Sequence, residues 1–228
     1  PAGHHSSALF VQSVPHVPIM IDNEANFAAY GEYMYGAGGG TETMLFVKAA
    51  TGIGSGLIIG GLIYRGRHGL AGELGHLTMD PTGTVCRCGS RGCLETLVGG
   101  ARLVDQVKQA YSGYRLDLPT SLEGVIERAK GGDQVCRRVL QDASRNIGLA
   151  LARVSNLLNP ELIVLGGELG RASELLVEPA EQGLRLYALR GMFDHPKPTE
   201  MTGSQLGLLA GAQGALGFAL NVDRTVTR

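Results

Sequence analysis

Several features are missing from this sequence of 228 residues, and each absence excludes a class of protein. The sequence lacks a run of about 20 apolar residues, which excludes a membrane-spanning helix. Its first residues show neither the charged region nor the apolar region of a secretory signal. The net charge is only -1, which argues against a long-range electrostatic search for nucleic acid by this chain itself. We therefore expect a cytoplasmic protein without a membrane partner.

Cysteine is scarce as well, because the chain has four cysteines and three of them fall within eight residues. Such a cluster fits a metal site in a reducing compartment better than a disulfide framework. The chain shows neither a solenoid repeat nor a low-complexity segment. It is 44% hydrophobic, and its length suits one large domain or a domain with part of another.

Glycine, by contrast, is abundant, with 35 residues that fall between hydrophobic runs. This arrangement predicts tight connections between the strands and helices of an α/β domain. The expected strands cover residues 17–21, 44–47, 57–59, 62–64 and 161–165. The expected helices end near residues 35, 111, 131, 158, 189 and 220.

Local signals predict how some of these elements begin or turn. Thr120 and Glu123 match a capping box for the helix that ends near residue 131. Asp133 is the expected cap of the long helix that follows. The Gly60–Gly61 pair predicts a two-residue hairpin turn between strands. Cys136 lies in the long helix, far from the other cysteines, and we expect it to be a small buried hydrophobic residue.

One histidine and three cysteines have the spacing of a zinc site. His76 precedes Cys86 by ten residues, and Cys88 and Cys93 follow within the same loop. Four such ligands complete a tetrahedral set and leave no open position, so the zinc would be structural and not catalytic. The acids that flank this segment, Glu73 and Glu95, remain free to accept hydrogen bonds from a polar ligand.

Two other stretches allow both a structural and a functional interpretation. Asn23 and Glu24 follow an apolar run, where they either cap a helix or deliver an amide and an acid into a ligand cleft. A glycine-rich turn at residues 51–56 and the Gly166–Gly167 turn could cradle a phosphate through backbone N–H groups, or serve only close packing. The first of these is not a P-loop, because no Gly-Lys-Ser/Thr follows it.

Together these motifs resemble those of the ROK family of sugar kinases and sugar-responsive repressors. The glutamate, histidine and cysteines of residues 73–95 are similar to that family's metal and sugar motif. Residues 21–32 resemble its sugar-binding and catalytic segment, and residues 51–56 its second phosphate loop. Residues 159–167 resemble its nucleotide-side strand and turn, and the resemblance runs from about residue 14 to residue 220.

The resemblance implies an actin-like, ribonuclease H-like ATPase fold, in which two α/β lobes enclose the ligand. Residues 1–22 would be a remnant of the N-terminal lobe, and residues 23–205 the C-terminal lobe with the sugar site and zinc loop. Residues 206–228 would form a helix that packs back toward the N-terminal lobe. The family's first phosphate loop, of the DxGxT type, does not occur in this sequence, so we expect that lobe and any helix-turn-helix to lie upstream.

Site roles are also implied by the resemblance. Sugar hydroxyls would contact Asn23, Glu73, His76 and Glu95. The implied nucleotide- or phosphate-binding residues are Thr51, Gly52, Gly54, Gly166 and Gly167. Zinc would hold His76 through one ring nitrogen and so fix the outward direction of the other N–H group.

Glu24 departs from the kinase pattern, which has an aspartate as the catalytic base after the asparagine. A general base must come within about 2.6–3.2 Å of the hydroxyl it activates, and an extra methylene moves the carboxylate by about a bond length. We therefore expect the sugar-sensing region of a repressor-type regulator that binds a hexose or a derivative. Its partners would be DNA, through an N-terminal domain outside this chain, and further copies in a dimer or tetramer. The alternative is an ATP-dependent, glucokinase-like hexose kinase that uses Mg²⁺ and Glu24.

Overall fold

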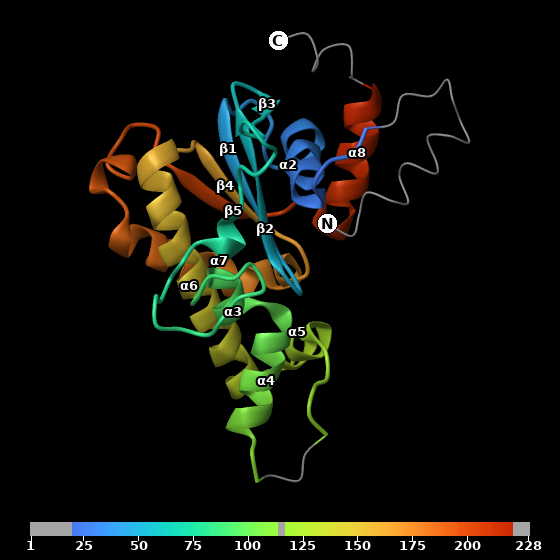
Figure 1. The fold of residues 1–228 in the computed structure, drawn as a ribbon, viewed down its shortest axis with the longest axis vertical. Coiled ribbons are helices and arrows are strands. Elements are labelled where there is room, and N and C mark those ends of the chain that lie inside the picture. The colour runs from blue at the N-terminus through green and yellow to red at the C-terminus, as the bar shows by residue number, and fades with distance from the viewer. Residues whose placement is uncertain (1–19, 114–116, 221–228) are drawn as a thin grey trace, which may run out of the picture.

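A computed structural model describes residues 20–113 and 117–220, which form a five-stranded mixed sheet with helices on both faces (Figure 1). In chain order the strands are β1 (Thr43–Ala49), β2 (Ile53–Ile59), β3 (Leu62–Ile63), β4 (Leu162–Gly166) and β5 (Glu200–Gly203), and their order across the sheet is β3-β2-β1-β4-β5. Strand β1 pairs antiparallel with β2 and parallel with β4; β2 and β3 are antiparallel, and β4 and β5 are parallel.

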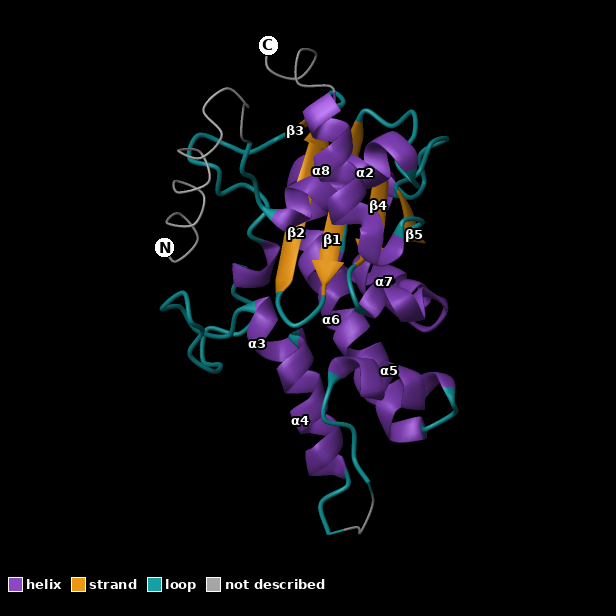
Figure 2. Ribbon diagram, turned by 90° about the vertical axis from the view of Figure 1, so that its right-hand side faces the viewer, coloured by secondary structure: helices purple, strands orange, loops and turns teal. Residues whose placement is uncertain are grey.

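The helices form two layers and an extension. One face of the sheet is covered by α2 (Glu24–Tyr35) and α8 (Ala210–Leu220), and the other by α6 (Gln134–Leu158) and α7 (Ser173–Tyr187) (Figures 1 and 2). Beyond one end of the sheet lie α3 (Leu94–Val98), α4 (Gly100–Ala110) and α5 (Leu122–Lys130). The 3-10 turns are η1 (Leu74–His76), η2 (Leu169–Ala172), η3 (Arg190–Met192) and η4 (Gly207–Leu209).

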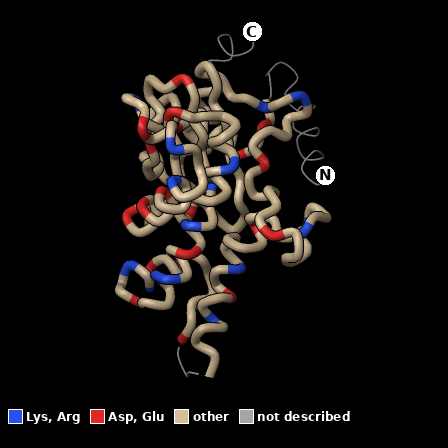
Figure 3. The backbone as a smooth tube through the Cα atoms, turned by 90° about the vertical axis from the view of Figure 1, so that its left-hand side faces the viewer, with Lys and Arg blue, Asp and Glu red and all other residues tan. Residues whose placement is uncertain are grey.

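The surface of these elements matches the near-neutral composition. Along the backbone drawn in Figure 3, lysine and arginine positions are interspersed with aspartate and glutamate positions, and neither sign dominates. Among the described helices, none combines the length and the hydrophobicity that a bilayer crossing requires.

Alternation along β1 divides the core into two clusters. Leu45 and Val47 belong to the larger cluster, with the α6 side, whereas Met44 and Phe46 belong to the smaller cluster under α2 and α8. Successive side chains of a strand point to opposite faces. Lys48, the next residue in the Met44–Phe46 series, therefore stands on the face that α2 covers.

Most predicted boundaries agree with the structure. Asp133 caps α6 by accepting a hydrogen bond from the Cys136 N–H at 3.0 Å, and Cys136 is fully buried as expected. Gly60 and Gly61 form the β2–β3 hairpin turn with φ of 59° and 74°, as their sequence predicts. Of the expected strand at residues 17–21, residues 17–19 lie outside the described part, and Met20 and Ile21 are not in a strand.

Two local predictions are wrong. The helix expected after Thr120 is capped by Ser121, whose hydroxyl accepts from the Gly124 N–H at 3.1 Å, so no capping box forms with Glu123. The glycine-rich turn is also shorter than expected, because β2 already begins at Ile53 and Gly54 lies within the strand. A Cβ on Gly54 would lie 3.3 Å from the Cβ of Ala25, so this glycine allows α2 to pack closely on the strand.

Helices α2 and α8 also meet through glycine. A Cβ on Gly31 would clash with the carbonyl oxygen of Ala210, and one on Gly214 with the carbonyl oxygen of Phe27. The residues at both positions must therefore lack a side chain for the two backbones to approach this closely.

Glu32, at the end of α2, is a fully buried carboxylate. It accepts hydrogen bonds from the backbone N–H groups of Ala37 at 2.9 Å and Leu206 at 2.9 Å, and from the hydroxyl of Ser204. These donors satisfy the buried charge, which would otherwise be costly, and they join α2 to the segment that leads into α8.

Candidate functional site

The start of β2 is the place where the predicted site segments meet. Ser55 donates from its hydroxyl to the carbonyl of Gly72 at 2.7 Å, which attaches the segment that carries Glu73 and His76. On the other side, Ala25 of α2 packs against Gly54. The backbone N–H of Ile53 donates to Glu95 at 2.9 Å. Three segments far apart in the sequence are thus gathered around three consecutive residues of one strand, Ile53, Gly54 and Ser55.

Asn23 and Glu24 form the α2 side of this site. Asn23 caps the helix, with its Oδ1 accepting from the Ala25 N–H at 2.9 Å, and both Asn23 and Glu24 are exposed. The structural interpretation of Asn23 is therefore confirmed. Capping uses the Oδ1 atom alone, so it does not exclude the functional interpretation, in which the amide N–H groups donate to a ligand.

Glu73 and His76 form the second side of the site. The Nδ1 atom of His76 lies 3.6 Å from the Cys86 sulfur, while its Nε2 faces the Glu73 carboxylate at 3.8 Å. One ring nitrogen thus faces the cysteines and the other faces the Glu73 carboxylate. A ligand hydroxyl between Nε2 and the carboxylate could bond to both.

Glu95 is less free than the sequence suggested. One oxygen accepts the Ile53 N–H, and the Arg87 guanidinium lies 3.1 Å from the other oxygen. Only 14% of the Glu95 side chain is exposed, whereas 75% of Arg87 is exposed. A ligand that uses Glu95 must therefore share its carboxylate with Arg87 or displace the exposed Arg87 side chain.

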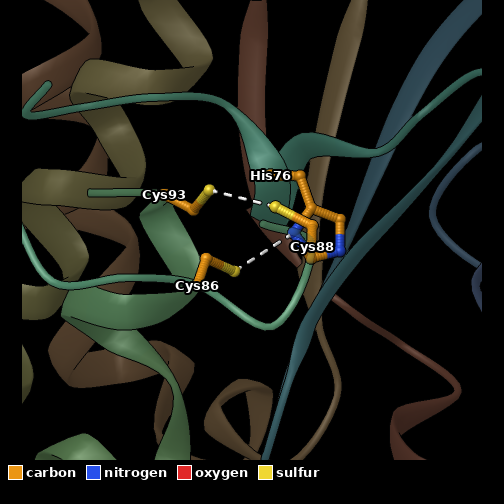
Figure 4. Close-up of side chains that lie close together, drawn as sticks. All are labelled: His76, Cys86, Cys88 and Cys93. Atoms are coloured by element: carbon orange, nitrogen blue, oxygen red, sulfur yellow. Dashed lines mark hydrogen bonds between the residues drawn. The ribbon is translucent and has the colours of Figure 1, made fainter. Parts of the chain in front are cut away.

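The structure brings the four predicted zinc ligands together (Figure 4). The ligand atoms of His76, Cys86, Cys88 and Cys93 lie within 4.8 Å of one another. The Cys86–His76 contact is 3.6 Å and the Cys88–Cys93 sulfur contact is 3.7 Å. Ligands of a tetrahedral zinc ion are separated by about 3.7 Å, given usual zinc–sulfur and zinc–nitrogen bond lengths. The four side chains therefore fit a closed zinc site.

The thiols of the cluster differ in their tendency to lose a proton. Burial raises the pKa of the Cys93 thiol to about 11, and neighbouring Cys88 and Cys86 add to the rise. The pKa of the exposed Cys88 thiol is lowered instead, chiefly by a hydrogen bond from the Ser90 backbone. A zinc ion held by these four side chains would supply the positive charge that favours the thiolate over the thiol.

Two of the five predicted phosphate-binding residues, Gly167 and Thr51, border two adjacent cavities. One cavity of about 360 Å³ is lined by Gly167 and Glu168 together with Glu24. The other, of about 340 Å³, is lined by Thr51 and again by Glu168. Gly167 has a φ of 77°, in the left-handed region that favours glycine. Because both cavities are lined by Glu168, the two glycine turns lie at one region of the surface.

The remaining three members of that set have different surroundings. Gly52 lies beside Glu95, since a Cβ there would be 2.7 Å from its carboxylate oxygen. Gly166 ends β4, and Gly54 lies within β2 and not in a turn.

Lys48 is a residue of this region that sequence reasoning missed. Its ammonium nitrogen lies 2.5 Å from the Glu24 carboxylate, and it lines the same cavity. The available signal was a single charged residue near the end of the strand TMLFVKA, which is mostly apolar and shortly precedes a glycine turn.

Comparisons with known proteins connect this site to a family. The family model described as ROK family matches residues 11–222. A glucokinase from Halalkalibacterium halodurans is 35% identical over 206 residues, which cover 86% of this chain and 62% of the relative. A xylose repressor from Caldicellulosiruptor bescii is 34% identical over 176 residues, covering 74% of this chain and 44% of the relative. The chain thus spans less than two thirds of the length of either relative.

A solved structure shows the same architecture. The ROK family glucokinase from Streptomyces griseus, in complex with glucose and AMPPNP, is 32% identical and superposes with a TM-score of 0.80. The match covers 92% of this chain and 70% of that one. It confirms the expected α/β fold of the actin-like class.

Proposed function

Because the chain belongs to the ROK family, we propose that it forms the sugar-sensing region of a transcriptional regulator. The ligand is a hexose or a derivative, held by Asn23, Glu73, His76 and Glu95. A sugar presents many O–H donors, and carboxylates are pure acceptors that can each take two hydrogen bonds. The convergence of these side chains on the start of β2 supports this assignment.

The observation that carries the choice of a regulator is Glu24. It replaces the aspartate expected of a kinase, and its carboxylate is engaged by Lys48 at 2.5 Å. A general base in phosphoryl transfer must accept the hydroxyl proton at close range. To do so, Glu24 would have to leave its ion pair and reach the hydroxyl with a longer side chain. The site is therefore suited to hold a sugar without activating it.

Sugar binding would regulate the protein by favouring one arrangement of its two lobes. DNA would be contacted by an N-terminal domain outside this chain, as the similarity to a xylose repressor suggests. If the sugar prefers one arrangement and DNA the other, each must weaken the binding of the other by the same factor.

A hexose kinase is the second candidate, and one observation favours it. Both glycine turns border adjacent cavities, which an ATP-dependent relative could use for phosphates. This function would need ATP, Mg²⁺ and Glu24 as the base, together with a first phosphate loop outside this chain.

The two functions are separated by a coupled ATP assay and calorimetry on the intact protein with D-glucose and D-xylose. We expect sugar binding without turnover, and at least tenfold weaker binding in Asn23→Ala and Glu73→Gln. Glu174→Gln, which removes an exposed carboxylate on α7, serves as the matched control and should bind like wild type. Turnover of either sugar that disappears in Glu24→Gln would establish the kinase instead.

A further inference from the structure

Lys48 occupies a prominent position in the sheet. In the register of β1 it lies opposite Gly54 of β2 on one side and Gly166 of β4 on the other. Neither neighbour has a side chain, so the lysine stands alone on the face toward α2. Lys48 therefore lies between the two glycine turns. Its neighbour Gly54 is flanked by Ile53, which contacts Glu95, and by Ser55, which contacts Gly72.

The partner of Lys48 is Glu24, and their ion pair is a surface pair. The side chains are 28% and 68% exposed. Exposed ion pairs contribute little to stability, because solvent screens the attraction and two long side chains lose freedom. Holding the fold together is thus a weak reason for a lysine in this apolar strand, and a role toward a ligand explains it better.

We propose that Lys48 and Glu24 act as one donor–acceptor pair of the sugar site and make it selective for neutral sugars. This inference rests on the proposed function. Each sugar hydroxyl both donates and accepts hydrogen bonds, but the carboxylates of the site can only accept. The Lys48 ammonium has three N–H donors, of which the bond to Glu24 uses one. It can therefore donate to the oxygen of a hydroxyl whose hydrogen points to Glu24.

The charges around the pair disfavour a phosphorylated sugar. The cavity that Lys48 lines also carries the carboxylates of Glu123 and Glu168. Its other cation, Arg171, is bound to Glu123 at 2.7 Å and to Glu127 at 3.3 Å. The lining thus holds three carboxylates and two cations, and both cations are already paired with acids. A phosphate group beside Lys48 would therefore meet net like-charge repulsion, which would weaken its binding. The pair itself is neutral and suits an uncharged hydroxyl.

Calorimetric titration of the intact protein with D-glucose, D-xylose and glucose 6-phosphate tests the proposal. For the sugar that wild type binds, we expect Lys48→Met to weaken affinity at least tenfold and Lys48→Arg to restore part of it. Lys130→Met removes the lysine of another exposed pair, with Glu174, and should leave affinity unchanged. In a double-mutant cycle, the variant that carries both Glu24→Gln and Lys48→Met should lose less sugar affinity than the product of the two single-variant fold-losses.

Three outcomes would overturn the inference in different ways. Unchanged sugar affinity in Lys48→Met, with only a lower melting temperature, would make Lys48 a structural tie between β1 and α2. Tighter binding of glucose 6-phosphate than of glucose, lost in Lys48→Met, would make it an anion site. A wild-type protein that binds none of the three compounds would contradict the proposed function itself, and this inference with it.

Discussion

At the scale of single residues, short-range polar contacts define the starts of α2, α5 and α6. Asp133 accepts the Cys136 N–H at the start of α6 and also the Tyr111 hydroxyl at 2.8 Å. Burial alone would raise the pKa of Asp133, but these hydrogen bonds outweigh it and hold the pKa below the ordinary 3.8. The charged carboxylate is therefore the form that the folded protein prefers.

This preference predicts an acid-dependent contribution to stability. The Asp133 charge stabilises the fold above about pH 4, where the unfolded carboxylate is ionised, and this contribution is lost as the pH falls through the lower folded pKa. Asp133→Ala should lower the unfolding free energy at pH 7 by about 1 kcal/mol, measured by urea denaturation. The loss in Asp133→Asn should shrink between pH 7 and pH 3.

Asp142, an exposed acid of the same helix, provides the control. Asp142→Asn should change the unfolding free energy by less than about 0.5 kcal/mol at pH 7, as is usual for surface ion pairs. An Asp133→Asn deficit that stays constant with pH would contradict the assignment.

Most of the short-range contacts could be predicted from the sequence, although the Thr120–Glu123 capping box was wrong, whereas the long-range partners of Lys48 and Glu32 could not. The caps at Asn23 and Asp133 follow from the residues beside them. The Lys48–Glu24 pair joins residues 24 positions apart, and Glu32 meets Ser204 across 172 positions. Such partners depend on how the sheet and helices pack, which no local pattern encodes.

At the scale of elements, close glycine contacts set how α2 and α8 pack. A side chain at Gly214 would meet the Phe27 carbonyl, which is backbone and cannot turn aside. At Gly211 in the same helix, a Cβ would lie at an ordinary 3.4 Å from Glu24 Cγ. The two glycines differ in packing but share a helix, so they form a matched pair.

Alanine at these two positions should have opposite effects. Gly214→Ala should lower the unfolding free energy by about 2 kcal/mol through overpacking. Gly211→Ala should raise it by about 0.5 to 1 kcal/mol, because alanine is the better helix former. Chemical denaturation of both variants measures this, and a Gly214→Ala protein as stable as wild type would refute the close packing.

The glycine-rich stretch at residues 51–56 shows why element boundaries were harder to predict than elements. Glycine favours turns, so the pattern predicts a loop, but in the structure Gly54 and Gly56 lie in β2 beneath α2. A Cβ on Gly56 would be 2.5 Å from the Ala25 carbonyl oxygen. Glycine thus also allows a helix to pack closely on a strand. Only the packed structure distinguishes this use of glycine from its use in a turn.

At the scale of the whole molecule, the segment of residues 72–93, which carries His76 and the three clustered cysteines, connects the sheet to the α6 layer. It joins β2 through Gly72 and Ser55, and it meets α6 where Arg153 donates to the Thr78 carbonyl at 2.8 Å. Metal binding to such a loop is coupled to folding, since the ligands converge only in the folded chain. The sequence predicted this set because ligand type and spacing are local properties.

Metal analysis of the intact protein should find about one zinc per chain. Cys88→Ser should lose the metal and melt at a lower temperature, because a closed site needs all four ligands. Cys136→Ser, which changes the buried cysteine of α6, should keep the metal. Wild-type protein without zinc, or a Cys88→Ser variant with full zinc content, would refute the site.

The contacts of Glu32 have a consequence for the order in which the elements fold during synthesis. The hydroxyl donor to Glu32, Ser204, leaves the ribosome 172 residues later, and α8, the helix that α2 packs against, follows Ser204. At usual rates of synthesis this is a delay of roughly 10 to 30 s. During that time the carboxylate has only its local partner and stays in water. The first described helix is thus among the last to find its final place, when the end of the chain arrives.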